Sequence, residues 1–410
     1  MILVVAGLTR EAKAARERLP DRISIGVLAR TFSKRLVEEV IDAADVREVR
    51  TRLLPARMMV FFTLACWLFM RSGHGLVLSK LADAEAVGGS GWGGWSSPTT
   101  SSLSKAKARL GEEVFRLLFD RVRGPVGSAA TPGVFWRGLR VLTVDGFTLD
   151  LPDTPENSQF FGRGSNGSAT PNPFPQLRAL VLAEGGTRSL IAGVYGPYSS
   201  GEQTLAEGLL ADLGPGMILL ADRNFPSYTL WRAAAATGAQ LCWRMSASFT
   251  LPVLKVLPDG SYLSQIRPRR KKDGPPVTVR VIEYSVRTTD ADGSEQSELF
   301  CLATTLLDPD TAPMEELAAL YHDRWQAETG IDELKTVERG GPEVVLRSKS
   351  PALVGQEFWA FLCVYQAVRD LISTAADDGG GLDPARISFK RAFEAARDSA
   401  TRAALSPREP

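Results

Sequence analysis

YHDRWQAETGIDELK, residues 321–335, carries a regularly spaced set of polar side chains. Tyr321, Arg324, Glu328 and Lys335 follow one another at intervals of three, four and seven residues. At about 100° per residue, these intervals place all four side chains on one face of an α-helix. The stretch therefore predicts an amphipathic helix that presents Glu328 along the edge of a cleft. The apolar face beside it, which would anchor the helix in a core, consists of Leu320, Ala327, Ile331 and Leu334.

The same spacing also has an ordinary explanation. The arginine and the glutamate stand four residues apart, and ion pairs at this interval are common on solvated helix faces. Two acids upstream favour the chemical interpretation. The apolar run 217–221 predicts a strand covered on both faces, and Asp222 follows it directly. The run 139–144 predicts a second strand, with Asp145 at or near its end.

The remaining segments predict an α/β order. Alternating residues on either side of Glu184-Gly185-Gly186 are typical of a β-hairpin. A strand, a hairpin, a helix, a strand, a helix, a strand and a final helix together predict a ribonuclease-H-like mixed sheet. The strands are expected over 139–144, 177–182, 189–194, 217–221 and 299–304, and the helices over 201–213, up to residue 236, and over 313–337.

Composition divides the rest of the chain. A run of helical patterns precedes a Gly/Pro-rich linker at 124–133, and strand-like segments interrupt the α/β order as a β-rich insertion. An all-α N-terminal domain therefore precedes the α/β catalytic domain. The predicted divisions are an extension (1–20), a helical N-terminal domain (21–123), a catalytic domain in two pieces (134–242 and 299–376), the insertion between them (243–298) and a linker with a C-terminal helix (377–410).

The overall composition limits the chemistry. In 410 residues, 48 Lys and Arg face 47 Asp and Glu, so any nucleic-acid site must come from local clustering of cations. The four cysteines are far apart and lie among apolar neighbours, which favours reduced core thiols over a disulfide framework or a CxxC zinc site. Two histidines exclude a histidine-rich metal site. Oxygen ligands, and hence Mg²⁺ or Mn²⁺, remain open.

Targeting signals are not evident. The N-terminus has no basic n-region and no cleavage pattern, and the longest apolar stretch, 58–70, is too short to span a bilayer. That stretch is better explained as a buried helix. We therefore expect a cytoplasmic protein with no membrane partner.

The pattern Tyr-x2-Arg-x3-Glu-x6-Lys at 321–335, joined to the two upstream aspartates, resembles the signature of bacterial transposases of insertion-sequence family four. The resemblance covers roughly residues 20–400. It implies a cut-and-paste transposase, near the bacterial nucleoid, that acts on the inverted-repeat ends of a transposon and on target DNA. It also implies a homodimer in the synaptic complex. Asn224 departs from the glycine expected there in relatives, which puts the geometry of that loop in doubt.

The resemblance further implies a role for each residue of the signature. Asp145, Asp222 and Glu328 would be the catalytic residues and would hold two Mg²⁺ or Mn²⁺ ions, with Asp145 between them. Tyr321, Arg324 and Lys335 would position the transposon end. Taken singly, each aspartate is more simply explained as a structural cap, and Arg324 and Lys335 as an ion pair and a solvated charge. Phosphodiester cleavage by two metals needs three such carboxylates, which favours the joint interpretation.

Two clusters of cations are candidate DNA contacts. Arg267, Arg269, Arg270, Lys271 and Lys272 place five cations within six residues of the insertion. Such a run can bind phosphates by counterion release, although many are solvated turns. Lys105, Lys107 and Arg109 open a predicted helix over 104–122, and the resemblance places this helix in a DNA-end recognition domain. A solvated first turn is the ordinary alternative.

Two other function classes are compatible with parts of the pattern. A catalytically inactive DNA-binding remnant of an insertion element would retain the recognition domain, but the intact acids argue against it. A serine hydrolase is disfavoured because Gly-x-Ser-x-Gly is absent and His322 has no evident partner.

Overall fold

Five neighbouring strands, beginning at one edge, form one part of a mixed sheet. In the computed structural model their order is β4-β3-β2-β5-β6. The first three are antiparallel, and β5 and β6 run parallel to β2. This order confirms the predicted ribonuclease-H-like fold. The strands are β2 (Leu139–Asp150), β3 (Gln176–Glu184), β4 (Leu190–Pro197), β5 (Met217–Ala221) and β6 (Gln240–Arg244). The structure describes residues 25–50, 52–81, 98–164, 171–289, 295–324, 330, 332–341 and 344–402, so the predicted extension 1–20 lies outside them.

The predicted insertion continues the same sheet. Beyond β6, the order is β10-β9-β8-β7, all antiparallel. Two expectations are corrected here: the strand that follows the second helix is β6, and the boundary at 298 falls inside β10. The reason is pairing, because β10 is long enough to join β6 at one end and β9 along its whole length. These strands are β7 (Lys255–Val256), β8 (Tyr262–Ile266), β9 (Val277–Thr289) and β10 (Glu295–Thr304), and the short β1 (Phe135–Trp136) pairs with β2.

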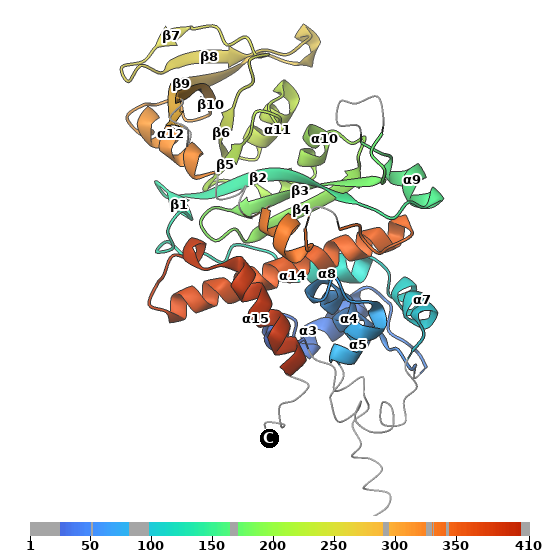
Figure 1. Ribbon diagram of the computed structural model, residues 1–410. Helices are drawn as coiled ribbons and strands as arrows, with labels where there is room; N and C mark the ends of the chain where they lie inside the picture. The colour runs from blue at the N-terminus through green and yellow to red at the C-terminus, as the bar shows by residue number, and fades with distance from the viewer. Residues whose placement is uncertain are drawn as a thin grey trace, which may run out of the picture.

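Helices cover both faces of the sheet (Figure 1). Side chains alternate between the faces along each strand. Leu142 and Val144 of β2 pack in the core beneath α10 and α11, whereas Val141 packs in the core beneath α12. Further along β2, Phe147 and Leu149 contribute to the core shared with α14. These helices are α10 (Glu202–Glu207), α11 (Tyr228–Ala236), α12 (Met314–Asp323) and α14 (Pro351–Asp378).

A helical bundle lies on the far side of α14 and is built around α4. All residues of α4 except Arg57 are buried, which confirms the buried helix predicted at 58–70. Among the described residues, no helix is long and apolar enough to cross a membrane. The bundle comprises η1 (Gly26–Arg30), α3 (Lys34–Ala43), α4 (Ala56–Leu68), α5 (His74–Leu81), α7 (Thr100–Leu110) and α8 (Glu113–Val122), with α15 (Phe389–Arg402) against it.

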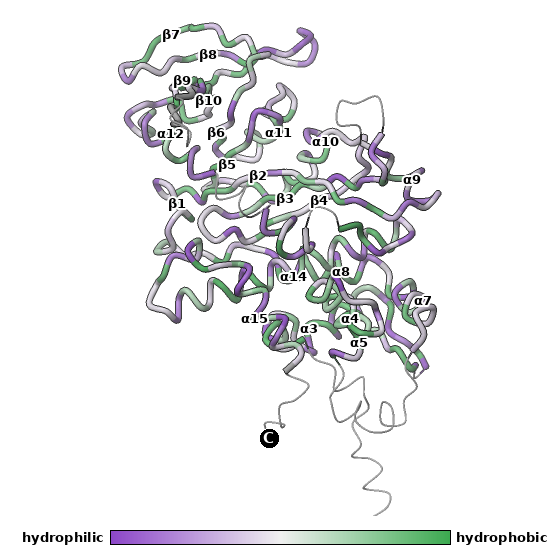
Figure 2. The backbone as a smooth tube through the Cα atoms, in the orientation of Figure 1, coloured by the Kyte–Doolittle hydropathy of each residue, from purple (hydrophilic) through white to green (hydrophobic). Residues whose placement is uncertain are grey.

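One hydrophobic core joins the bundle to the sheet. Phe361 of α14 lies between them, with its ring centroid 4.4 Å from that of Trp67 on α4 and 6.2 Å from that of Phe147 on β2. Figure 2 shows the hydrophobic segments gathered where α4, α8 and α14 meet. The core is therefore continuous across the predicted linker 124–133.

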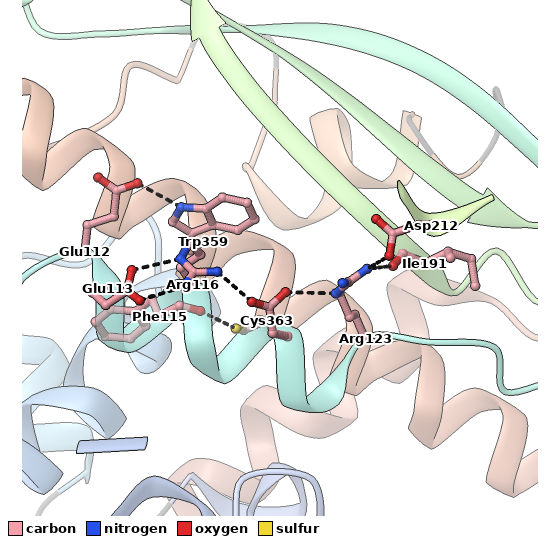
Figure 3. Close-up of polar contacts among 10 residues, drawn as sticks. Glu112, Glu113, Phe115, Arg116, Arg123, Ile191, Asp212, Trp359 and Cys363 are labelled. Carbon is pink, nitrogen blue, oxygen red and sulfur yellow. Dashed lines mark hydrogen bonds and ion pairs between the residues drawn. The ribbon is translucent and has the colours of Figure 1, made fainter. Parts of the chain in front are cut away.

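Polar contacts fasten α8 to both neighbours (Figure 3). Trp359 Nε1 on α14 donates to Glu112 Oε1 at 2.9 Å. Arg123, which caps the carboxyl end of α8, pairs with Asp212 at 2.5 Å and donates to the backbone oxygen of Ile191. The last helix of the bundle is thereby held against the sheet as well as against α14.

Several boundaries differ from expectation because of local chain chemistry. The predicted helix 104–122 is two helices, since Gly111 at φ 74° ends α7. The cap of α7 is Thr99, whose side chain accepts from the backbone N–H of Ser102. The segment between β2 and β3 contains α9 (Pro155–Phe161), and the helix predicted over 201–213 divides into α10 and η3 (Leu210–Asp212).

Candidate active site

The two predicted aspartates lie side by side. Thr143 of β2 pairs with Leu220 of β5, and two residues further along each strand come Asp145 and Asp222. In parallel strands about 4.8 Å apart, residues in register project from the same face. Both side chains are half-buried. The sheet therefore brings two carboxylates from distant parts of the chain to one place.

Asp145 is not at the end of its strand, which corrects the prediction. β2 continues to Asp150 because its pairing with β3 extends that far. Pairing with β5, however, stops at Thr143, so Asp145 stands just beyond the end of the parallel ladder. Asp145 Oδ1 accepts a hydrogen bond from the backbone N–H of Gly146 at 2.8 Å. The carboxylate is oriented by its own strand at the open edge where β5 ends.

A third charged side chain, Arg244, lies beside the aspartates on the neighbouring strand β6, and the sequence analysis did not predict it. Ala221 of β5 pairs with Trp243 of β6, so Arg244 stands beside Asp222. The Arg244 guanidinium pairs with Glu298 and lies 4.0 Å from the ring centroid of Phe300. A signal was available, since the apolar residues 241–243 end in a charge just as 217–221 do.

Tyr321 and Arg324 close this region from α12. Tyr321 is buried, and burial raises the pKa of its phenol; nearby Arg324 lowers that pKa and nearby Asp222 raises it. The Arg324 guanidinium carbon lies 5.5 Å from the centroid of the Tyr321 ring. Two of the four signature residues thus share one environment with the second aspartate.

The helix predicted over 313–337 is not one uniform element. α12 ends at Asp323, and a separate π-helix, η5 (Glu333–Glu338), contains the half-buried Lys335. A constant 100° step therefore does not relate Lys335 to Tyr321, because a π-helix winds more slowly than an α-helix. Glu328 lies outside the described residues.

The oxygen atoms of the two aspartates are suitable ligands for a hard divalent cation. Two carboxylates on adjacent strands supply oxygen ligands of the kind that Mg²⁺ and Mn²⁺ prefer. No group of three or more potential metal ligands occurs in the described ranges, and the third predicted ligand is Glu328, which they do not include.

A cavity of about 370 Å³ opens on the same face of the sheet. Its floor includes Thr143 and Leu220, each two residues before an aspartate, and Arg324 stands in its wall. The turn between β3 and β4 forms the opposite wall, with Glu184 and Arg188. The cavity thus adjoins the strand positions that precede the two aspartates, although neither aspartate lines it.

The cation cluster of the insertion is exposed. Arg267, Arg269, Arg270, Lys271 and Lys272 all face solvent at the turn after β8. The turn is attached to α11, where Arg232 donates to the backbone oxygen of Asp273 at 3.0 Å and Tyr228 donates to that of Pro275 at 2.8 Å. The turn that carries the cluster is therefore held against α11, the helix that follows Asp222 in the chain.

The second cluster is only partly available. Lys105 and Arg109 are exposed on α7, but Lys107 is 5% exposed. Lys107 lies on the same helix face as the buried Leu103 and Leu110, so it cannot reach a DNA backbone as predicted. All three residues lie beyond the first turn of α7, because that helix begins at Thr100.

The families and individual proteins that this chain resembles are transposases. Residues 22–120 match the family "Insertion element 4 transposase N-terminal", and residues 136–366 match the family "Transposase DDE domain". The chain is 28% identical over 361 residues to "Transposase InsG for insertion sequence element IS4" of Escherichia coli (strain K12), covering 86% of this chain and 78% of that protein. It is 27% identical over 199 residues to "Putative transposase InsZ" of the same strain, covering 48% and 64%.

A piggyBac transposase synaptic complex with hairpin DNA, determined by cryo-electron microscopy, aligns with a TM-score of 0.49 and 10% identity over 92% of this chain and 80% of that chain.

Proposed function

Because the chain belongs to the insertion element 4 family of DDE transposases, we propose that it cuts double-stranded DNA at the ends of its element and joins those ends to target DNA. The transposase activity itself follows from the family, which uses divalent metal ions. The observation that carries the finer proposal is the register of β2 and β5, which sets Asp145 beside Asp222.

We assign the metal ligands to Asp145, Asp222 and Glu328. Two ions, Mg²⁺ or Mn²⁺, would supply activation of a water and stabilisation of the leaving oxygen. By resemblance to the family, Asp145 would be the ligand shared by the two ions. Glu328 follows Arg324 by four residues, and an extended chain of that length spans at most ~14 Å. Covalent geometry therefore limits Glu328 to this distance from Arg324, which lies near Tyr321 in the surroundings of Asp222.

The cations around the aspartates would hold the DNA strand. Arg324 and Arg244 have planar guanidiniums that can contact a phosphate through two parallel hydrogen bonds. Lys335 offers a point charge, and the Tyr321 hydroxyl is a potential donor to a phosphate oxygen. Arg244 is added here because its strand places it next to Asp222.

The reaction proceeds by phosphoryl transfer at each step. A water oxygen attacks phosphorus at the transposon end, the phosphorus–O3′ bond breaks, and a 3′-OH is released. That 3′-OH then attacks another phosphodiester, on the opposite strand or in target DNA, and a new 3′-OH leaves. No step requires a covalent bond to Ser, Tyr or Cys. The side chains therefore need only to orient the strands and hold the ions.

The setting of the reaction follows from the substrate. We propose that a homodimer brings two ends together, and that the protein works in the cytoplasm at the bacterial nucleoid. The helical domain would bind the end sequence through Lys105 and Arg109.

An inactive DNA-binding remnant is not favoured, since both described aspartates are present in matching register.

Strand cleavage by the purified protein tests this function. With linear DNA that carries the inverted repeats flanking its gene, we expect Mg²⁺-dependent release of a 3′-OH at the element's end. Chelation of the metal should stop cleavage, because the proposed attack by water depends on the metal, while end binding should persist. Strand nicking and gel-shift assays on the same DNA measure the two properties. Cleavage that continues undiminished in chelator would contradict the proposal.

The cation cluster of the insertion makes a separate prediction. Replacing Arg267, Arg269, Arg270, Lys271 and Lys272 by alanine should weaken binding to DNA of any sequence, because each lost phosphate contact lowers the salt dependence of log K by about 0.9. The slope of log K against log salt for a random duplex measures this. The control is Lys390→Ala with Arg391→Ala, which removes exposed charges from α15. An unchanged slope in the cluster variant would mean that these side chains are only solvated.

A further inference from the structure

A buried ion-pair cluster lies in the chain shortly after Glu328. Glu333 Oε1 accepts a hydrogen bond from Arg188 Nη1 at 3.0 Å, and Glu333 Oε2 pairs with Arg369. Arg369 Nε in turn donates to the hydroxyl of Tyr365 at 3.1 Å. We refer to Arg188, Glu333, Tyr365 and Arg369 as the Glu333 cluster. It joins three elements that are distant in sequence: the β3–β4 turn, η5 and α14.

The charges in the cluster are unfavourable for stability alone. Arg369 is 0% exposed and Arg188 is 8% exposed, so two cations share one carboxylate away from water. Burial lowers the pKa of both guanidiniums, and Arg188 lowers that of Arg369 further. Taking charges out of water is costly, and an apolar contact of the same volume commonly stabilises a fold equally well. A function that depends on exact placement of η5 accounts for the arrangement better.

Arg188 is held in place by the β3–β4 turn. Its backbone has φ 60°, a left-handed conformation that is uncommon for a residue other than glycine. The turn is organised by the buried carboxylate of Glu184, which accepts from the backbone N–H of Gly127 at 2.8 Å and from Thr187 Oγ1 at 2.5 Å. Arg188 is thus presented to Glu333 by a rigid turn of the catalytic sheet.

A second contact fastens the same segment. At Gly330, an added Cβ would stand 3.1 Å from the hydroxyl of Tyr365 and 3.5 Å from the Cβ of Arg188. The backbone of residue 330 therefore lies directly against the residues that hold Glu333. Both contacts lie within five residues of Glu328 in the chain.

We propose that Arg188 and Arg369 are positioning residues for strand cleavage. By pairing with Glu333, they hold η5, which begins five residues after Glu328, against the sheet that carries Asp145 and Asp222. This inference rests on the proposed metal role of those three acids. It gives the β3–β4 turn and α14 a part in the reaction without contact to DNA or metal.

The test compares Arg369→Lys and Arg188→Lys with the wild-type protein. Each substitution keeps the charge but loses the planar fork that reaches Glu333. In single-turnover nicking at saturating DNA, we expect rates reduced by ~10- to ~100-fold, the usual result of small misplacement at a reacting centre. The Mg²⁺ concentration for half-maximal rate should rise, whereas metal-free end binding should remain within about twofold. A purely structural role would not alter the Mg²⁺ dependence.

A matched control and a substitution that changes no charge complete the design. Arg123→Lys removes a guanidinium fork from the Asp212 pair in Figure 3, which does not include Glu333, and should retain wild-type Mg²⁺ dependence. Gly330→Ala presses the segment against Tyr365 without changing any charge and should raise the Mg²⁺ requirement as the lysine variants do; it decides the matter if they fail to fold.

The possible outcomes are distinct. Wild-type Mg²⁺ dependence in the folded lysine variants, or in Gly330→Ala where they do not fold, would overturn this inference alone. Absence of metal-dependent cleavage by the wild-type protein would instead overturn the proposed function.

Discussion

Asp145→Ala is expected to abolish strand nicking while leaving end binding intact. Loss of a shared metal ligand removes several kcal/mol of transition-state stabilisation, and ~4 kcal/mol corresponds to a rate reduction of ~10³-fold. Asp222→Ala and Glu328→Ala should have the same effect. Nicking and gel-shift assays on the transposon end measure cleavage and binding separately. Nicking retained in all three variants would remove the assignment of the acids.

The same substitution has a diagnostic effect on stability. Asp145→Ala removes one of the proposed metal ligands, so the variant should lose the rise in thermal midpoint that Mg²⁺ gives the wild-type protein. Asp150→Ala, on the same strand but on its opposite face, is the matched control and should keep the Mg²⁺ effect.

Phe361→Ala is expected to destabilise the helical bundle and the sheet together, by about 3–5 kcal/mol. Phe361 is 0% exposed and contacts an aromatic ring on each side, Trp67 in the bundle and Phe147 in the sheet. Its removal leaves a cavity that neither part can close alone. Chemical denaturation followed by tryptophan fluorescence and by circular dichroism measures the change.

Phe160→Ala provides the comparison for that experiment. Phe160 is 53% exposed on α9, and substitutions at such positions usually change stability by less than about 0.5 kcal/mol. If Phe361→Ala destabilised only the bundle and left the sheet unaffected, the two parts would be independent domains. A shared loss of stability would show that the continuous core acts as one unit.

The local sequence pattern was sufficient to predict an element whose residues all lie in the same kind of surroundings. The run 217–221 is apolar at every position, and it is a strand covered on both faces with Asp222 directly after it. Pattern was insufficient for Asp145, because the length of β2 depends on how far β3 extends beside it. Strand pairing is a non-local property, and the residues near Asp145 do not contain it.

Lys107 shows a signal that was present but not used. Leu103, Lys107 and Leu110 are spaced at four and three residues, so a helix puts all three on one face. That phase predicts a buried lysine, whereas counting cations in the sequence predicted a basic surface. The structure agrees with the phase.

By itself, the sequence determined the family and the order of strands and helices as far as α11, and it made Asp145 and Asp222 candidate acids. These follow from spacing, periodicity and a signature, which are properties of neighbours along the chain. Only the tertiary structure decided that Arg244 stands beside Asp222 and that Arg188 and Arg369 meet at Glu333. Glu333 and Arg188 are separated by 145 residues, and a charged side chain on an amphipathic segment looks the same whether it faces water or a buried partner. Which of these it faces is set by packing between elements, and that information is distributed over the whole chain.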